Sequence, residues 1–499
     1  MNNVIVDIEN DVNDAFEVIN RLADSGEIMK ARRRCEQLLN RFPEHPRVLH
    51  GLGLMLYRSG DLEDGESLIR ASIKKNPDFS DAYQNLGRIL MYSLRIEEAE
   101  TAYRKALELS PDDLAVMEAL SLVLARLEKY DEALSICDRM LSNNPSCAAA
   151  YGNYGYIQMS LGKTRDGVSL LKKSLALKEN CSTNSALLFF LNLLPEYDQK
   201  SIFEESLKWG KTFASRLRAR SRKHFNWPDP NRKLRIGYVS GDFRKHPVGY
   251  HLRPVLAAHD KNRFEIFLYN AFPNCDAITE EFSNYVDCYR DVSLKPDEKV
   301  ESIIRKDGID ILVDLAGHTA FNRLLLFARK PAPVQLTWIG YFNTTGVKAI
   351  DYFIGDPTTT PAEDDSNFVE RILRLPDIRF CYEPLQYAPE VAPLPALKNK
   401  CITFGSFNAI HKILPEVISL WCRILHAVPG SRMLLKSRSF KEEKVKKDFA
   451  ERFAAQGISS DRLDLRQNSS HCEMLAEYGD MDISLDTFPY NGGATTCEA

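Results

Sequence analysis

Apolar residues up to about residue 181 recur at the three- and four-residue spacing of amphipathic helices. Leu120, Val123, Leu124 and Leu127 form one such set. This spacing places the apolar side chains on one face of a helix, where they can pack against a neighbouring helix. The pattern remains helical over residues 182–225. The N-terminal part of the chain is therefore predicted to be α-helical throughout.

A period of 34 residues runs through this helical part, carried by prolines and by small residues in two further phases. The residues that keep the step are Pro43, Pro77, Pro111 and Pro145, then Gly53, Gly87 and Gly155, then Ala31, Gly65, Ala99, Ala133 and Gly167. Small residues let two helices approach closely, and proline ends the second one. The period is the signature of tetratricopeptide repeats. Four clear repeats and a degenerate fifth are predicted over residues 12–181.

After a linker at residues 225–233, short apolar runs alternate with helical segments. Strands are predicted at residues 234–240, 264–270, 309–317, 334–340 and 351–356, and a helix at 297–308. Strands separated by helices favour a doubly wound parallel sheet. Residues 182–232 are thus predicted to form a helical connector and residues 233–383 a first α/β lobe.

A proline-rich linker at residues 384–399 leads into a second series of the same kind. Strands are predicted at residues 401–407, 431–437, 462–466 and 481–486, and helices at 415–429 and 441–457. The predicted fold class is α plus α/β, with a tetratricopeptide solenoid followed by two lobes that each contain a parallel sheet. Residues 400–499 form the second lobe, and a cleft between two such lobes suits a nucleotide-bearing substrate.

Composition narrows the class of protein. The net charge of -4 and pI near 6.3 give no basic field for nucleic acid. Residues 1–27 lack a signal-peptide pattern, and the longest apolar run, residues 186–194, is far shorter than the roughly 18 residues of a membrane span. Eleven cysteines without a C-x-x-C pair indicate reduced thiols. A cytoplasmic protein without nucleic-acid or membrane partners is predicted.

Polar residues gather where the predicted parallel strands end. In chain order they are His246 and His251, His318 and Thr319, the turn 340–346, Asn408 and Lys412, and the closing stretch YNGGATTCE. Glycine-rich turns let backbone N–H groups approach phosphate oxygens, and a lysine neutralises the charge on a departing diphosphate. P-loop, dinucleotide-binding and metal-binding motifs are absent from the sequence. The sequence therefore predicts that the protein stabilises the charge on the diphosphate without a metal ion.

Three stretches carry a resemblance to a known family: PAPVQLTWIGYFNTTG, ITFGSFNAIHK and MDISLDTFPYNGGATTCEA. Placed behind tetratricopeptide repeats, they resemble the O-linked N-acetylglucosamine transferase family, and within it the SPINDLY-like and bacterial members. The resemblance implies a two-lobed, GT-B-like fold. It also implies a metal-independent, inverting transfer of a sugar from a nucleotide diphosphate sugar to Ser or Thr of proteins.

The resemblance also implies roles for individual residues. His246 would handle the proton of the acceptor, and Lys412 would stabilise the departing diphosphate. The residues expected to bind the donor are Gly340, Thr344, His318, Asn408, Lys412, Thr495, Thr496 and Glu498. Of these, Gly340 and the NTTG turn would face the sugar, and the C-terminal residues would hold phosphate and ribose.

Three positions depart from the family's pattern. Phe342 stands where proline is usual, Ala409 replaces a common amide side chain, and Ala494 interrupts a run of threonines. The donor remains open between UDP-N-acetylglucosamine and GDP-fucose, although the residues of the motifs are closer to those of the SPINDLY-like members. No cofactor beyond the donor substrate is expected.

Alternative functions remain open. A concave solenoid favours extended protein or peptide acceptors, with a spacer or an oligomerisation module as the alternative. The chain could be a tetratricopeptide adaptor whose glycosyltransferase region is inactive, or a glycosyltransferase that acts on small molecules. The repeats favour protein partners over small molecules.

The sequence stops six residues after Gly493. That is fewer than the roughly 12–15 residues an isolated helix needs for marginal stability. The second lobe is therefore expected to be an incomplete part of a longer enzyme. Thr495 and Glu498 are expected to be poorly organised and donor affinity to be weak.

Overall fold

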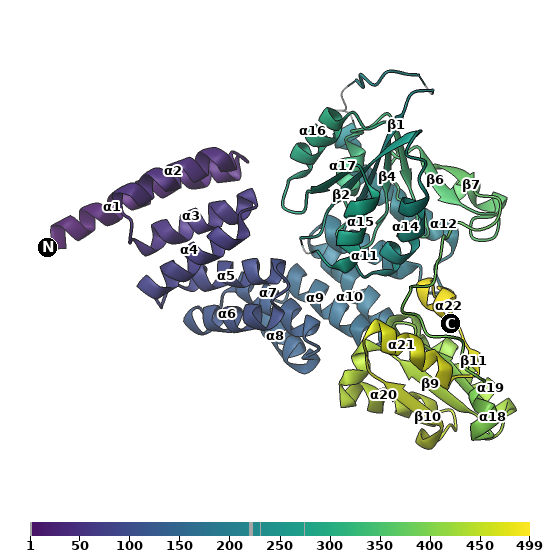
Figure 1. Cartoon of the computed structure of the whole chain (residues 1–499). Coiled ribbons are helices and arrows are strands. Elements are labelled where there is room, and N and C mark those ends of the chain that lie inside the picture. Colours follow the sequence, from purple (N-terminus) through teal and green to yellow (C-terminus); the bar gives the residue numbers. More distant parts are fainter. Residues whose placement is uncertain (1, 219–222, 230, 274) are drawn as a thin grey trace. The chain divides into compact units, whose positions relative to one another are not determined.

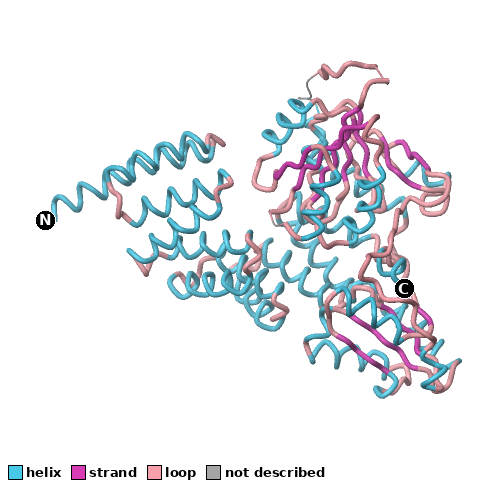
Figure 2. Tube along the Cα trace, in the orientation of Figure 1, coloured by secondary structure: helices cyan, strands magenta, loops and turns pink. Residues whose placement is uncertain are grey.

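The computed structural model describes residues 2–218, 223–229, 231–273 and 275–499 (Figure 1). It divides into two compact units, Met1–Pro145 with Ser293–Pro296, and Ser146–Val292 with Asp297–Ala499. Helices alone occupy the N-terminal part, and strands are confined to two later sheets (Figure 2). The connector predicted for residues 182–232 lies partly outside the described residues, because 219–222 and 230 are not described.

The first unit consists of helices that pack in sequence order. They are α1 (Asn2–Asp24), α2 (Ile28–Arg41), α3 (Pro46–Ser59), α4 (Leu62–Lys75), α5 (Ser80–Tyr92), α6 (Ile96–Leu109), α7 (Leu114–Arg126) and α8 (Tyr130–Asn143). A Cβ atom at Gly53 would lie 2.8 Å from the Gly65 carbonyl oxygen, and a Cβ at Gly65 would lie 2.9 Å from the Gly53 carbonyl oxygen. The small residues of the 34-residue period thus lie where paired helices cross, which confirms the predicted repeat fold.

The second unit begins with the same kind of helix pair. It contains α9 (Ala148–Ser160), α10 (Thr164–Leu177), α11 (Cys181–Leu191), α12 (Gln199–Trp209), a π-helical turn η1 (Gly210–Ala214) and α13 (Ser215–Arg218). A Cβ atom at Gly155 of α9 would lie 2.9 Å from the carbonyl oxygen of Gly167 in α10. Helices α11 and α12 contact each other, and α12 contacts the first lobe at a 3-10 turn, η2 (Ala362–Asn367).

The first lobe is built on a seven-stranded sheet in which every pair of neighbours is parallel. Its strands are β1 (Leu234–Ser240), β2 (Phe264–Asn270), β3 (Cys288–Asp291), β4 (Ile311–Asp314), β5 (Val334–Thr337), β6 (Tyr352–Gly355) and β7 (Arg371–Arg374). The connecting helices are α14 (Pro247–Ala258), α15 (Ala277–Tyr285), α16 (Asp297–Asp307) and α17 (Leu324–Ala328). The order β3-β2-β1-β4-β5-β6-β7 reverses between β1 and β4, where open α/β sheets bind ligands.

The second lobe has a four-stranded parallel sheet in the order β10-β9-β8-β11. Its strands are β8 (Thr403–Ser406), β9 (Arg432–Lys436), β10 (Leu463–Arg466) and β11 (Ile483–Ser484). Its helices are α18 (Pro395–Asn399), α19 (Pro415–Ala427), α20 (Glu443–Ala454), α21 (His471–Glu477) and α22 (Ala494–Glu498). The order of this sheet reverses between β8 and β11.

The structure corrects several predicted elements. β1 and β2 have the predicted bounds, whereas the strands predicted at residues 309–317, 334–340 and 481–486 are shorter. Their last residues, and also residues 309–310 and 481–482, lie outside the strands of the two sheets. β3 and β7 were not predicted. Both are edge strands, and half-exposed polar residues such as those of Cys288–Asp291 obscure the apolar pattern of a buried strand. None of the helices in the described part of the chain is long and apolar enough to cross a membrane.

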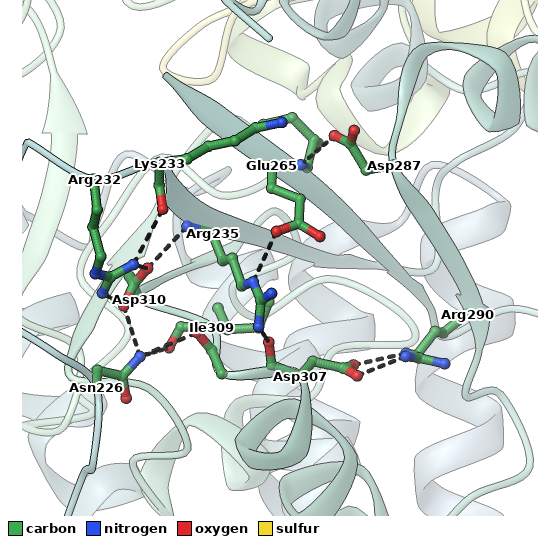
Figure 3. Close-up of polar contacts among 12 residues, drawn as sticks. Asn226, Arg232, Lys233, Arg235, Glu265, Asp287, Arg290, Asp307, Ile309 and Asp310 are labelled. Atoms are coloured by element: carbon green, nitrogen blue, oxygen red, sulfur yellow. Dashed lines mark hydrogen bonds and ion pairs between the residues drawn. The ribbon is translucent and has the colours of Figure 1, made fainter. Parts of the chain in front are cut away.

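A polar network ties the linker before β1 to the amino-terminal ends of β1 and β4 (Figure 3). Asp310, which is 6% exposed, accepts hydrogen bonds from the Arg232 guanidinium at 2.5 and 2.8 Å and from the Asn226 amide at 2.7 Å. It also accepts the backbone N–H of Arg235 at 2.9 Å. These donors lower the pKa of the Asp310 carboxyl, although burial opposes the shift. The network lies at the end of the sheet opposite the carboxyl ends of the strands.

We expect Asp310→Ala to lower the free energy of unfolding by about 3 kcal/mol, because it leaves a half-buried guanidinium and an amide without their acceptor. Since folding lowers the pKa of Asp310, its contribution is present above the ordinary Asp pKa and is lost as pH falls through the folded value. Urea unfolding at pH 7 and at pH 3 measures both effects. Asp377→Ala, at an exposed carboxylate of the same lobe, is the matched control. An equal loss in both variants contradicts the structural role.

Candidate active site

Most of the predicted site residues follow the strands at which the strand order of each sheet reverses, whereas Gly340 and Thr344 follow β5. His246 follows β1 and His318 follows β4 in the first sheet. Asn408 and Lys412 follow β8 in the second sheet, and the YNGGATTCE stretch follows β11. The topology therefore brings chemistry-bearing residues to the position at which doubly wound sheets bind ligands.

His246 is the N-cap residue of α14, with Pro247 at the first helical position. Its Nδ1 accepts a hydrogen bond from the Val248 backbone N–H at 3.3 Å and lies 3.5 Å from Oδ1 of Asp242. Burial lowers the pKa of His246, and the Asp242 carboxylate opposes this shift. The imidazole is therefore neutral at pH 7 and can accept a proton.

The turn at residues 340–346 is held by hydrogen bonds of its own side chains. The Thr344 hydroxyl donates to Oε2 of Glu370 at 2.6 Å, and the Thr345 N–H donates to Oε1 at 2.9 Å. The Thr345 hydroxyl donates to the same carboxylate. Burial raises the pKa of Glu370. Thr344 uses its hydroxyl to build the turn, so its predicted contact with the donor stays a prediction.

Gly340 also lies in a confined place, since a Cβ there would be 2.0 Å from the Leu315 carbonyl oxygen. Glycine at this position allows the backbone after β5 to cross directly over the backbone after β4. The predicted contact between Gly340 and the sugar would have to use the backbone. No described contact tests it.

His318 is 1% exposed and lies in the core of the first lobe. Its Nδ1 lies 3.1 Å from the Ser185 hydroxyl, and its Nε2 lies 2.9 Å from the carbonyl oxygen of Thr345. Burial lowers the pKa of His318 to about 4. Both ring nitrogens already have protein partners, so in this structure His318 supports the turn rather than offering a free nitrogen. Its predicted role in donor binding remains a prediction.

Lys412 lies in a 3-10 turn, η3 (Ile410–Lys412), directly after β8. Its ammonium donates to the Asn491 carbonyl oxygen at 3.0 Å and lies 4.9 Å from the centroid of the Tyr490 ring. Burial lowers the pKa of Lys412 to about 8, and Asp486 opposes the shift. The side chain is thereby directed toward the glycine-rich segment after β11, where a diphosphate would need a counter-charge.

Asn408 and Asp486 organise the same segment. The Asn408 amide donates to Oδ1 of Asp486 at 3.1 Å, and that oxygen also accepts the Gly492 N–H at 2.7 Å. The Thr496 hydroxyl donates to Oδ2 of Asp486 at 2.9 Å. Asp486 thus joins the residue after β8 to the residues after β11.

Residues Ala494–Glu498 form the one-turn helix α22. Oε1 of Glu498 lies 2.9 Å from Nε2 of His471, and the carbonyl oxygen of Thr495 accepts the Tyr478 hydroxyl at 3.1 Å. The expectation that Thr495 and Glu498 are poorly organised therefore does not hold in the structure. His471 of α21 and Tyr478 of the adjoining turn hold the short helix in place through these contacts.

The structure brings some of the predicted residues together and leaves others apart. Asn408, Lys412 and Thr496 share the Asp486–Asn491 segment. In the described part of the chain, the hydrogen bonds and ion pairs of His246 stay within its own loop. Tyr490 connects the lobes, since its ring lies 5.5 Å from that of Phe342.

Sequence reasoning missed several residues that contact the site: Asp486, Tyr490, Glu370, His471 and Arg379, whose guanidinium lies 5.1 Å from the centroid of the Phe342 ring. Tyr490 and Asp486 lie within a quoted motif, so proximity to the glycines was a usable signal. Glu370, Arg379 and His471 lie on other segments and meet the site only through the fold. Among the described residues, no group of three or more His, Cys, Asp or Glu side chains could hold a metal ion. Metal independence itself remains a prediction.

The fold and the site define a class: a tetratricopeptide solenoid joined to a two-lobed glycosyltransferase fold with parallel sheets. A model of glycosyl transferase family 41 matches residues 215–391 and 394–499, and a tetratricopeptide repeat model matches residues 19–79 and 85–146. The chain belongs to glycosyl transferase family 41. The resemblance drawn from the three sequence stretches is thus confirmed.

Individual relatives agree with this assignment. A protein of Arabidopsis thaliana named "Probable UDP-N-acetylglucosamine--peptide N-acetylglucosaminyltransferase SPINDLY" is 41% identical over 320 residues, 62% of this chain and 35% of that protein. The corresponding protein of Petunia hybrida is 42% identical over 320 residues, with 62% and 34% covered. A solved structure of a mutant Thermobaculum terrenum O-GlcNAc transferase has a TM-score of 0.79 and 33% identity, covering 84% of this chain and 80% of that chain. The chain spans about 35% of the length of the first curated relative.

We expect Glu370→Ala to loosen the turn at residues 340–346, because two hydroxyls and one N–H lose their buried acceptor. The cost in free energy of unfolding should be about 3 kcal/mol. Amide hydrogen exchange of Thr345, followed by mass spectrometry, should accelerate at least tenfold. Glu363→Ala, at an exposed carboxylate nearby, should leave that exchange unchanged. Equal protection in both variants shows that Glu370 does not hold the turn.

Proposed function

We propose that this chain carries the donor-binding and reaction site of an inverting protein O-glycosyltransferase. The sugar moves from UDP-N-acetylglucosamine or GDP-fucose to Ser or Thr hydroxyls of proteins. The observation that carries the proposal is the position of Lys412, a lysine of lowered pKa directed at the glycine-rich segment after β11. Membership of family 41 supports the same reaction, and the names of the relatives support a peptide acceptor.

The proposed reaction uses groups from both lobes. The acceptor hydroxyl oxygen attacks the anomeric carbon of the sugar while the bond from that carbon to the diphosphate oxygen breaks. His246 takes the proton of the hydroxyl at Nδ1, in exchange for the hydrogen bond from the Val248 N–H. The Lys412 ammonium stabilises the charge on the departing diphosphate. Attack from the side opposite the leaving group inverts the anomeric centre. No metal ion or further cofactor takes part in the proposed reaction.

The tetratricopeptide helices are proposed to bind the acceptor protein. Stacked repeats expose an extended surface, which suits a peptide segment better than a small molecule. All eleven cysteines are free thiols, and this supports a reducing compartment such as the cytoplasm. The competing proposal, an adaptor with an inactive catalytic region, makes the opposite prediction for sugar transfer.

We expect the 499-residue chain to incorporate radiolabelled sugar from one of the two donors into protein acceptors. Lys412→Ala should reduce the rate about 10²–10³-fold, because a charge-stabilising group for the leaving diphosphate is lost. Lys398→Ala, at an exposed lysine on α18, should retain the rate. No transfer from either donor, together with partner binding unaffected in His246→Ala and Lys412→Ala, favours the adaptor.

Calorimetric titration with UDP and with GDP should separate the two donor types. The site should bind one diphosphate more tightly than the other, because guanine and uracil differ in size and in hydrogen-bonding groups. Failure to bind either diphosphate contradicts the proposed function.

The affinity for the preferred diphosphate should fall about tenfold between pH 7 and pH 9. Lys412 with a pKa of about 8 is charged below pH 7 and loses its proton as pH rises above 8. Lys412→Arg keeps its charge throughout this range, so its affinity should vary much less. Parallel pH profiles for the two proteins show that Lys412 does not supply the counter-charge.

A further inference from the structure

Arg379 is buried without enough partners for its charge. It is 1% exposed, and its Nε and Nη1 have no hydrogen-bond acceptor in the described part of the chain. Nη2 makes a single long hydrogen bond of 3.4 Å to the Tyr341 carbonyl oxygen. The guanidinium lies over the Phe342 ring at 5.1 Å and over the Phe353 ring at 4.7 Å. These cation–π contacts offset part of the free-energy cost of removing the guanidinium from water. Buried N–H donors normally also have hydrogen-bond acceptors, which Nε and Nη1 lack.

The backbone places Arg379 at the ligand-binding edge of the first sheet. Its N–H donates to Oδ2 of Asp356, which follows β6, at 3.0 Å. Its carbonyl oxygen accepts the indole N–H of Trp338, which follows β5, at 2.8 Å. Arg379 is thus fixed beside the carboxyl ends of two parallel strands, where a ligand approaches.

A second buried polar group with an unmet partner packs against the segment that carries Arg379. His251 of α14 is 2% exposed, and its ring stacks on Phe380 at 4.9 Å. Its Nδ1 lies 3.2 Å from the Cys381 carbonyl oxygen. A carbonyl oxygen only accepts, so Nδ1 carries the hydrogen and Nε2 of the neutral ring is an acceptor. Nε2 has no donor among the described residues.

The two groups differ in what each needs from a partner. Arg379 offers hydrogen-bond donors, and His251 offers an acceptor. An ionised carboxylate or phosphate could satisfy Arg379 but has no hydrogen for His251. Hydroxyl groups both donate and accept, so a polyhydroxylated ligand satisfies both side chains.

A chain of ring contacts leads from this segment to the diphosphate end of the site. Phe342 lies 5.6 Å from Phe380 and 5.5 Å from Tyr490, measured between ring centroids. Tyr490 in turn lies beneath the Lys412 ammonium. In a nucleotide diphosphate sugar, the sugar is the group bonded next to the diphosphate. A sugar extending from Lys412 would therefore meet Tyr490 and Phe342 before it reaches Arg379.

We propose that Arg379 and His251 form the sugar subsite, with Arg379 donating to a sugar oxygen and His251 accepting from a sugar hydroxyl. The inference rests on the proposed function, because it takes the ligand to be the donor sugar. Both residues act as specificity-determining residues: they select a donor whose sugar presents hydroxyl groups to the segment Arg379–Tyr382. The nucleoside diphosphate alone does not contact them.

Affinities of the 499-residue chain for UDP, UDP-N-acetylglucosamine, GDP and GDP-fucose, measured by NMR titration, test this subsite. Arg379→Met and His251→Phe preserve much of the volume and the apolar packing but remove the polar groups. We expect each variant to keep its affinity for the preferred nucleoside diphosphate within about twofold. The affinity for the corresponding sugar nucleotide should fall about tenfold or more, as expected for a lost hydrogen bond to a charged or buried group. Arg371→Met and His426→Phe, at exposed positions, should change neither affinity.

The outcomes separate the subsite from the function on which it rests. If the wild-type chain binds neither nucleoside diphosphate, the proposed function fails, and the sugar subsite fails with it. If the diphosphate binds and the variants weaken it as much as the sugar nucleotide, or weaken neither, the subsite is overturned. A rise in melting temperature for Arg379→Met with no change in sugar-nucleotide affinity identifies a buried charge with a purely structural role.

Discussion

The arrangement of the first lobe depends on a close approach between two backbones. A Cβ atom at Gly210 would lie 2.0 Å from the carbonyl oxygen of Gly346, and one at Gly346 would lie 2.1 Å from the carbonyl oxygen of Ser206. Neither position can carry a side chain without moving the helix or the turn. Gly346 also has a φ of 69°, which favours glycine. The π-helical turn after α12 is thereby pressed directly against the turn after β5.

Side chains of the connector complete this junction. The Asn343 amide donates to Asn192 and to Gln199, each at 3.0 Å, and the Asn192 amide donates to the Tyr341 hydroxyl at 3.0 Å. The helices that follow the repeats therefore do more than link two domains. They hold Tyr341 and Asn343, the two neighbours of Phe342, and so help to position the Phe342 ring. That ring contacts Arg379 and Tyr490.

The last repeat holds the second lobe in a comparable way. The Thr164 hydroxyl of α10 donates to the His411 carbonyl oxygen at 2.6 Å, one residue before Lys412. Arg165, the next residue of α10, pairs with Glu416 at 2.8 Å at the start of α19. The position of the proposed leaving-group lysine is therefore set partly by a tetratricopeptide helix. Within the second unit, the last repeat and the second lobe are therefore in direct contact.

The features of the fold and the site that the sequence could predict are those that depend on residues close together along the chain. The repeat, the buried strands β1 and β2 and the site segments after β8 and β11 arise from local periodicity and motifs, so they were predictable. The bonds from Thr344 to Glu370 and from His318 to Ser185 join distant segments. Local patterns carry no information on such pairings, so the sequence could not show that Thr344 and His318 have these partners.

Phe342 shows why a departure from a family's pattern has to be considered in three dimensions. In the sequence, Phe342 stands where the family's pattern usually has proline. In the structure its ring supports the Arg379 guanidinium on one side and contacts Tyr490 of the other lobe. Proline has no aromatic face and could not stabilise a buried cation in this way. Phe342 and the buried Arg379 therefore belong to one arrangement.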